Sequence, residues 1–329
     1  MRRSTLNRVL FLWGLLLVAA ATDARAAEPL RFSITGDNRG SSGFVSVLQR
    51  IVQLPGGAGR FMISPGDEDP IAVTREQLDA VFGKAFLWYP AVGNHEVPVK
   101  DVDNMKALHD YYDQRLQGKV NPGPPGTFQT TYSFDAGEVH VAIINQYWNG
   151  TTDPGADATT LAGLVKPLRK WLTLDLANTR KPWKLVVGHE PLFPHPDKDW
   201  GAARHETGAL QTLSPAACKD FWNILETSGA AAYICGHTHG YNRYRPEGSK
   251  VWQIDAGMAR GGKDWKYDTF IIGTADGKTL KFDTYRDLKE QGKFEVTDSL
   301  TLGAAPAPAP AAAAPEAPVP PKEPAKGAP

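Results

Sequence analysis

The sequence predicts an α/β protein, organised as a four-layer αββα sandwich of two mixed β-sheets flanked by helices. Three observations favour this fold class. Short apolar runs alternate with longer helical patterns through the middle of the chain, as strands and helices do in α/β proteins. Five of these runs end in glycine followed by hard polar residues. Further strand-like runs, most of them in the second half, supply the strands of a second sheet.

The composition allows a large buried core and argues against one class of function. Of 329 residues, 42% are hydrophobic and 22% are charged, which excludes global disorder. The 36 basic residues balance the 36 acidic ones, so we expect no nucleic-acid binding through bulk charge.

The first 26 residues have the pattern of a cleaved export signal. Arg2, Arg3 and Arg8 precede an apolar run over 9–21, and Ala24-Arg25-Ala26 provides small residues at the cleavage site. The run is short for a bilayer span, although an uncleaved anchor is the alternative. We therefore expect a periplasmic or secreted protein without a membrane span after cleavage.

The last 27 residues, 303–329, are rich in Pro and Ala and contain no aromatic residue. Such a segment cannot offset its ordering entropy by burial, so we expect a disordered tail. The folded domain is then 27–302. Within it, we expect Cys235 to be a buried free thiol, and a disulfide with Cys218 is the alternative.

The five apolar runs have the length and the glycine boundary of buried strands. They are residues 30–35, 60–65, 86–92, 183–187 and 230–235. The polar groups after them are Asp37, Asp67, Asn94-His95-Glu96, His189 and His237-Thr238-His239, each following a glycine.

Helical patterns and a second set of strands fill the rest of the domain. The helices are expected over 44–54, 74–86, 101–116, 161–178 and 216–227. The second sheet is expected to contain 131–134, 139–145, 251–255, 269–274 and 279–285, with hairpin turns at 135–138 and 275–278.

The polar strand ends predict a metal site. Ligands collect at the carboxyl ends of strands in open α/β sheets, so these groups should converge. Any one of them could instead cap a helix, but five coincidences favour a shared site. Carboxylates, an amide oxygen and imidazoles suit Mn, Zn or Fe rather than Ca. A shared carboxylate can hold two ions about 3.5–4 Å apart.

With these motifs in order, the chain resembles the calcineurin-like metallophosphoesterases. Their series of GD, GD, GNH-D/E, GH and GH-x-H motifs matches the five groups above. Within the family the chain is most similar to the purple-acid-phosphatase-like branch. Val186-Val187-Gly188-His189 matches its V-x-x-H, and 237–243 matches its H-x-H-x-Y-x-R.

The resemblance implies a role for each matching residue. Asp67 would bridge two divalent or trivalent metal ions (Mn, Fe or Zn). Asp37 and His239 would bind the first ion, and Asn94, His189 and His237 would bind the second. His95 would give a proton to the leaving oxygen. A hydroxide whose pKa the metals lower would attack phosphorus in line.

Two positions depart from the family pattern. Arg39 replaces a histidine that many relatives use as a ligand, and an arginine stays protonated and cannot bind metal. Arg39 could act in catalysis by clamping a phosphate oxygen, or it could pair with Glu96. We expect the first site to be weak or empty unless Glu68 or Asp69 reinforces it, and Asp69 could instead cap the following helix. Pro70 replaces the tyrosine that colours the purple enzymes, so we expect a colourless protein.

The long polar segment 194–214 interrupts the fold after His189. A loop of this length is usually functional, and its His195, Arg204 and His205 are candidates for substrate binding, with an exposed rim as the alternative for Arg204 and His205. Tyr147 and Trp148 lie in another irregular stretch, where core packing is favoured over stacking on a substrate.

These features predict an exported, metal-dependent hydrolase of phosphoric esters, acting on a phosphorylated small molecule and most simply a phosphomonoesterase. A phosphodiesterase or nucleotidase is the alternative within the class. A non-catalytic protein that binds a phosphorylated ligand is the alternative outside it, although such a binder needs no proton donor like His95.

Overall fold

The computed structural model describes residues 28–97, 102–151, 163–205, 209–261 and 267–303. The expected export signal and almost all of the Pro/Ala-rich tail therefore lie outside the described residues. Within these ranges, no helix has both the length and the apolar character that a membrane crossing requires.

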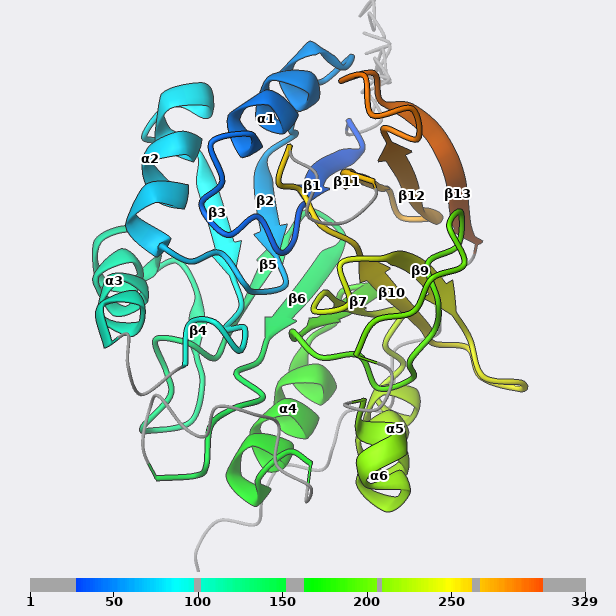
Figure 1. Cartoon of the computed structure of the whole chain (residues 1–329). Coiled ribbons are helices and arrows are strands. Elements are labelled where there is room, and N and C mark those ends of the chain that lie inside the picture. Colours follow the sequence, from blue (N-terminus) through cyan, green and yellow to red (C-terminus); the bar gives the residue numbers. More distant parts are fainter. Residues whose placement is uncertain (1–27, 98–101, 152–162, 206–208, 262–266, 304–329) are drawn as a thin grey trace, which may run out of the picture.

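The strands form two sheets, as predicted, and both are mixed (Figure 1). The first contains β1 (Leu30–Ile34), β2 (Phe61–Ser64), β3 (Leu87–Pro90), β11 (Thr269–Ala275), β12 (Thr279–Arg286) and β13 (Glu295–Gly303), in the order β13-β12-β11-β1-β2-β3. The second contains β4 (Asn121–Pro122), β5 (Tyr132–Ala136), β6 (Val139–Ile143), β7 (Trp183–Val187), β8 (Ala232–Cys235), β9 (Tyr241–Tyr244) and β10 (Trp252–Ala256), in the order β4-β5-β6-β7-β8-β10-β9.

The expected membership of the second sheet was wrong for two strands. β11 and β12 belong to the first sheet, where β11 pairs antiparallel with β1 from Leu30↔Ala275 to Ile34↔Ile271. The reason is that β1 lies inside its sheet and needs a hydrogen-bonding neighbour on both sides, with β2 parallel on the other. The hairpins β5–β6 and β11–β12 form at the predicted turns.

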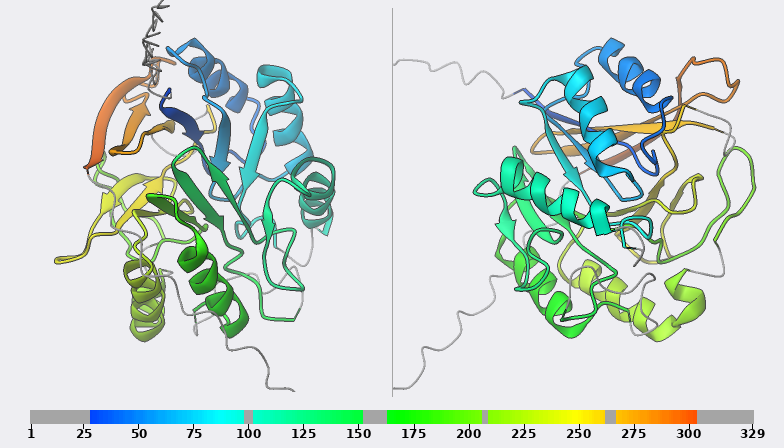
Figure 2. Two further views of the ribbon diagram at one scale, coloured as in Figure 1. Left: turned by 180° about the vertical axis from the view of Figure 1, so that it is seen from behind. Right: turned by 60° about the vertical axis from the view of Figure 1, so that its left-hand side comes forward.

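The helices cover the outer faces of the two sheets (Figure 2). On the first sheet lie α1 (Phe44–Gln53) and α2 (Ile71–Phe82), with α3 (Val102–Tyr111) and a following π-helical turn, Tyr112–Leu116, beside them. On the second lie α4 (Lys166–Asn178), the short α5 (Leu210–Leu213) and α6 (Pro215–Thr227). The layers therefore follow the order helix, sheet, sheet, helix, as predicted.

The longer helices bury a stripe of mostly apolar residues spaced three or four apart. In α4 this stripe is Leu168, Leu172 and Leu176, all with no exposed surface. Helix α2 begins at Ile71 and ends before Gly83, so the expected helix over 74–86 was displaced toward the N-terminus. Gly83 ends the helix because its φ of 84° lies in the left-handed region.

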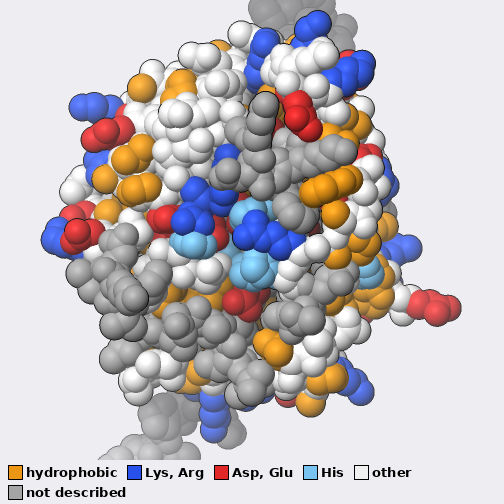
Figure 3. All heavy atoms as spheres, viewed as in Figure 1, with side chains coloured by type: hydrophobic (Ala, Val, Ile, Leu, Met, Phe, Trp, Pro, Cys, Tyr) orange, Lys and Arg blue, Asp and Glu red, His pale blue; other side chains and the backbone are white. Residues whose placement is uncertain are grey.

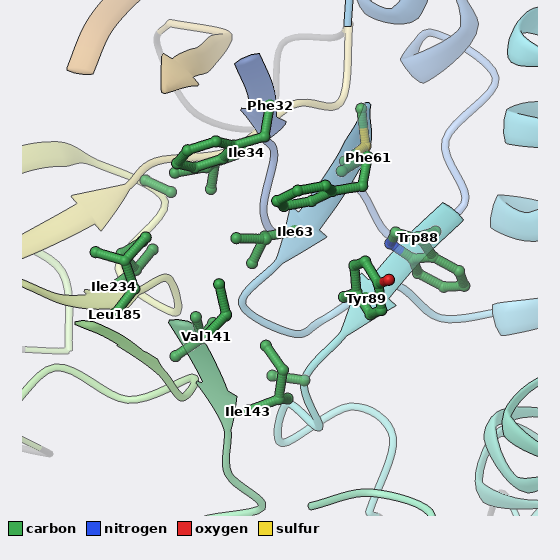
Figure 4. Close-up of a cluster of buried hydrophobic side chains, with 14 of the residues drawn as sticks. Phe32, Ile34, Phe61, Ile63, Trp88, Tyr89, Val141, Ile143, Leu185 and Ile234 are labelled. Carbon is green, nitrogen blue, oxygen red and sulfur yellow. The ribbon is translucent and has the colours of Figure 1, made fainter. Parts of the chain in front are cut away.

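The main core lies between the two sheets (Figure 4). Phe61 of β2 packs edge-to-face on Phe134 of β5 with ring centroids 5.3 Å apart, and Tyr89 of β3 stacks on Phe134 at 3.6 Å. These contacts fix the spacing of the sheets and so set where their strand ends meet. Cys218 and Cys235 are buried and unpaired, which confirms the expected free thiol.

Candidate metal centre

The polar groups predicted as ligands lie at the carboxyl ends of parallel strands from both sheets. Asp37, Asp67 and Asn94 follow β1, β2 and β3, while His189 follows β7. His237 and His239 follow β8, which is parallel to β7. The loops of the two sheets therefore meet at one edge of the sandwich, where these six side chains come together.

Four of these side chains direct their donor atoms at one point. Nε2 of His189 lies 3.1 Å from Oδ1 of Asn94, 3.3 Å from Oδ1 of Asp67 and 3.2 Å from Nδ1 of His237. Nδ1 of His237 lies 3.0 Å from the same Asn94 oxygen. Ligands held about 2.0–2.2 Å from a metal ion are separated by about 3.0–3.4 Å, so this spacing fits a bound ion.

The protonation of His189 supports this fit. Its Nδ1 lies 2.8 Å from the carbonyl oxygen of Pro65, which can only accept, so Nδ1 carries the proton. Nε2 then presents a lone pair to the carboxylate and amide oxygens. Burial lowers the pKa of His237 to about 2, so that ring is also neutral. Converging lone pairs repel one another unless a cation lies between them.

A second group of possible ligands adjoins the first. This group consists of the buried residues Asp37, Asp67 and His239. Each provides one donor atom, and these three atoms all lie within 4.8 Å of one another. Nε2 of His239 is 3.5 Å from Oδ1 of Asp37. Burial raises the pKa of Asp37, and the nearby carboxylate of Asp67 raises it further.

Guanidinium groups border this second group. Nη1 of Arg204 contacts Nδ1 of His239 and lies 3.2 Å from its Nε2. Arg260 donates from Nε to the backbone oxygen of Asp37 at 2.8 Å, and its Nη2 is 3.4 Å from Nε2 of His239. Arg204 was expected only as a candidate phosphate contact or a residue of the exposed rim, and Arg260 was not expected at the site.

Arg39 lies on the open side of the site. It donates to Nε2 of His95 at 2.6 Å and forms an ion pair with Asp69. The alternative pairing with Glu96 was wrong, because Glu96 accepts the backbone N–H groups of Gly93 at 2.6 Å and Glu68 at 2.7 Å. No side chain caps the N-terminus of α2, so Asp69 pairs with Arg39 instead of capping this helix.

His95 is about one-third exposed and lies against the expected shared ligand. Its backbone N–H donates to Oδ1 of Asp67 at 3.0 Å, and its Nε2 lies 3.6 Å from Oδ2 of the same carboxylate. Burial lowers the pKa of His95. The negative charge of Asp67 raises this pKa, and the positive charge of Arg39 lowers it further.

The strand ends place their ligands through unusual backbone conformations. Asp37, Asp67, His237 and His239 have φ between 53° and 72°, a region that costs a non-glycine residue of order 1–3 kcal/mol. The preceding glycines permit close approach, as predicted. A Cβ on Gly93 would lie 2.3 Å from the backbone nitrogen of Asp67.

Sequence reasoning missed a residue that positions His189. Oε1 of Gln146 accepts the backbone N–H groups of His189 at 2.6 Å and Glu190 at 2.8 Å. Gln146 closely follows strand β6, so a polar residue after an apolar run was the available signal. A similar signal was available for Arg260. This residue follows β10 and Gly257, just as the predicted ligands follow a strand and a glycine.

The substrate candidates of segment 194–214 lie in different places. The ring of His205 lies 4.4 Å from that of His237, which brings His205 to the ligand group. His195 packs at a tilt against Tyr244 of β9, with ring centroids 3.9 Å apart. Tyr147 and Trp148 are buried in the core, as expected. Figure 3 shows histidines beside Lys or Arg side chains at the centre of the face that carries the strand ends.

Comparison with known proteins agrees with this geometry. The family model for calcineurin-like phosphoesterases matches residues 31–241. Tartrate-resistant acid phosphatase type 5 of Homo sapiens is 25% identical over 281 residues, covering 73% of this chain and 75% of that protein. Purple acid phosphatase 21 of Arabidopsis thaliana is 24% identical over 225 residues, covering 66% of this chain and 46% of that protein.

Two solved structures share the fold. One, described as PhoD, has a TM-score of 0.59 at 10% identity and covers 85% of this chain and 70% of its own. GAP50 of Plasmodium, described as the anchor in the inner membrane complex, has a TM-score of 0.52 at 16% identity and covers 84% of this chain and 89% of its own. The chain belongs to the calcineurin-like phosphoesterase family and is a metal-dependent hydrolase of phosphoric esters.

Proposed function

We propose that the protein is an exported phosphomonoesterase that acts on a phosphorylated small molecule outside the cytoplasm. The observation that carries the proposed chemistry is the convergence of Asn94, His189, His237 and Asp67 on one point with spacings of 3.0–3.3 Å. Export rests on the signal pattern of residues 1–26.

These four residues would hold one ion of Mn, Zn or Fe. Asp37 and His239 share the neighbouring position with Asp67. Ions bound there would lower the pKa of water and neutralise charge on the phosphate. Buried groups fix the ligands in advance: Pro65 orients His189, and Glu96 holds the backbone of Asp67, with 3.0 Å between its Oε2 and the Asp67 nitrogen.

Arginines favour a monoester over a diester. Arg39 and Arg204 border the ligand group, and Arg39 is held by Asp69. A phosphate monoester carries up to two negative charges near neutral pH and a diester carries one, so guanidinium groups bind the monoester more strongly. His205, which lies against His237, is placed to meet the same phosphate.

His95 is the proposed proton donor to the leaving oxygen. A guanidinium can only donate, so Nε2 of His95 accepts from Arg39 and carries no proton in this arrangement. Donation to the leaving oxygen would come from the imidazolium form, because a proton lost from the neutral ring would leave an imidazolate. The ring would therefore take up a proton on Nε2, which ends the hydrogen bond from Arg39, before it gives a proton to the leaving oxygen.

Hydrolysis of p-nitrophenyl phosphate and of bis(p-nitrophenyl) phosphate tests the ester class, with Mn²⁺, Zn²⁺ or Fe added to the purified protein. We expect the monoester to have the larger kcat/KM by at least about tenfold, equivalent to about 1.4 kcal/mol. A larger value for the diester would replace the assignment with a phosphodiesterase.

The variant His95→Asn tests the proton donor. Loss of general acid catalysis should lower kcat by about 10²–10⁴-fold while metal content stays that of the wild type. His109→Asn is the matched control, because His109 lies in α3. Unchanged turnover in His95→Asn would remove His95 from the mechanism.

A further inference from the structure

Two arginines contact the position that the family uses for its first metal ion, and a third, Arg39, lies beside it. Arg39 stands in the chain where many relatives place a histidine ligand, and its side chain contacts His95 and Asp69. Arg204 and Arg260 reach the same position from two other parts of the chain and contact His239.

The contacts of Arg204 compete with metal binding by His239. Nη1 of Arg204 contacts Nδ1 of His239 and lies 3.2 Å from Nε2. A guanidinium remains protonated in proteins and offers only donors. An imidazole nitrogen that accepts from it has committed the lone pair that a metal ion would need. Arg260, 3.4 Å from Nε2, adds a second positive charge at the same ring.

The loop that carries Arg204 is anchored to the body of the protein. Asp197, in the same loop, forms a bidentate ion pair with Arg286 of β12, with Nη2–Oδ2 and Nη1–Oδ1 distances of 2.6 and 3.1 Å. Both side chains are almost completely buried. Asp197 also accepts the backbone N–H of Tyr241 at 2.9 Å. These contacts hold the loop of Arg204 against Arg286 and Tyr241, close to His239.

The two metal positions differ in character. At one, the lone pair of His189 meets the oxygens of Asn94 and Asp67 at 3.1 and 3.3 Å. At the other, His239 meets guanidinium donors. The position at His189 lacks a positive charge, which a metal ion would supply. The position at His239 already contains positive charge from the guanidinium groups.

We propose that the guanidinium of Arg204 takes the place of the first metal ion, so that the protein binds one ion through Asn94, His189, His237 and Asp67. The inference rests on the proposed metal-dependent function and departs from the two-metal site of the family. The three arginines match Asp37, Asp67 and Asp69 in formal charge.

Metal stoichiometry tests this proposal without relying on activity. The full-length purified protein is loaded with Mn²⁺, dialysed and analysed by inductively coupled plasma mass spectrometry. We expect one ion per chain, and an electron paramagnetic resonance spectrum of isolated Mn²⁺ without exchange coupling. His189→Ala should lose the ion, whereas His239→Ala should retain it.

A gain-of-site variant tests the role of the arginines. Arg204→Ala combined with Arg39→His removes the cation from His239 and restores the histidine of the family pattern, so we expect two ions per chain and exchange coupling. Arg245→Ala is the matched control, because Arg245 lies over the ring of Trp252. It should bind one ion, and circular dichroism should show that every variant is folded.

Several results would overturn the proposal. Two ions in the wild type would do so and leave the proposed function intact. One ion that is lost in His239→Ala but retained in His189→Ala would place the metal at the other position. A folded double variant that still binds one ion would remove the arginines from the explanation. No ion in the wild type would overturn both this inference and the proposed metal-dependent function.

Discussion

Replacing Gly93 by alanine tests whether close packing of the strand-end loops fixes the site. A Cβ at this position would lie 2.3 Å from both the backbone nitrogen and Oδ1 of Asp67, whereas ordinary contacts begin at 3.4 Å. Asp67 must therefore move by about 1 Å. A displacement of that size in a catalytic site costs about 10²-fold in rate, and overpacking typically costs about 1–3 kcal/mol of stability.

The assay compares kcat/KM for p-nitrophenyl phosphate with the Kd for Mn²⁺. We expect Gly93→Ala to lower kcat/KM by about 10²-fold and to weaken Mn²⁺ binding, because Asp67 is the proposed shared ligand. The control is Gly277→Ala in the β11–β12 turn, where an added Cβ meets nothing within 4 Å. If folded Gly93→Ala keeps the rate and affinity of the wild type, Asp67 is not held by this packing.

Three further predictions concern the body of the protein. Burial lowers the pKa of His140, but hydrogen bonds and charges from Asp175 and Asp135 raise it above 6.5. His140→Gln should therefore cost more unfolding free energy at mildly acidic pH than at alkaline pH, as urea denaturation can measure. Arg286→Ala leaves buried Asp197 unpaired and should lower the free energy of unfolding by about 3–5 kcal/mol, again by urea denaturation. Cys218, whose pKa burial raises to about 11, should react with a thiol reagent only after denaturation.

Each of these predictions has a contrary result. For His140, the stabilising charge is present below pH 6.5 and is lost as the pH rises through the raised pKa, so an equal cost at both pH values would contradict it. For Arg286, a variant as stable as the wild type would show that the pair with Asp197 adds no net stability. Rapid reaction of a thiol in the folded protein would contradict the burial of the cysteines.

The strand ends could be predicted from the sequence because their signal is local. An apolar run, a glycine and a polar residue fall within eight positions, as at Asp67 and His189, and the parallel strands then bring these ends together. The assignment of β11 to the first sheet could not be predicted, because it depends on which strand supplies hydrogen bonds to β1, far away in the sequence.

The contact of Arg204 with the expected ligand His239 could not be predicted for a related reason. Its loop is polar and has no periodic pattern, and its path is fixed by the ion pair between Asp197 and Arg286, which are 89 residues apart. Arg39 was recognised as a departure from the family pattern, but its partner Asp69 was assigned to other roles. The choice between Asp69 and Glu96 depends on backbone hydrogen bonds that a sequence does not display.

The ligands come from opposite layers of the sandwich, and this has a mechanical consequence. Asn94 follows a strand of one sheet and His189 follows a strand of the other, 95 positions later. An ion held by both would join the layers as a cross-link does, and closing a chain loop of that length is worth roughly 4–5 kcal/mol in the chain-entropy account. Removal of the ion by a chelator should then increase hydrogen exchange along the seam between the layers, far beyond the ligands themselves.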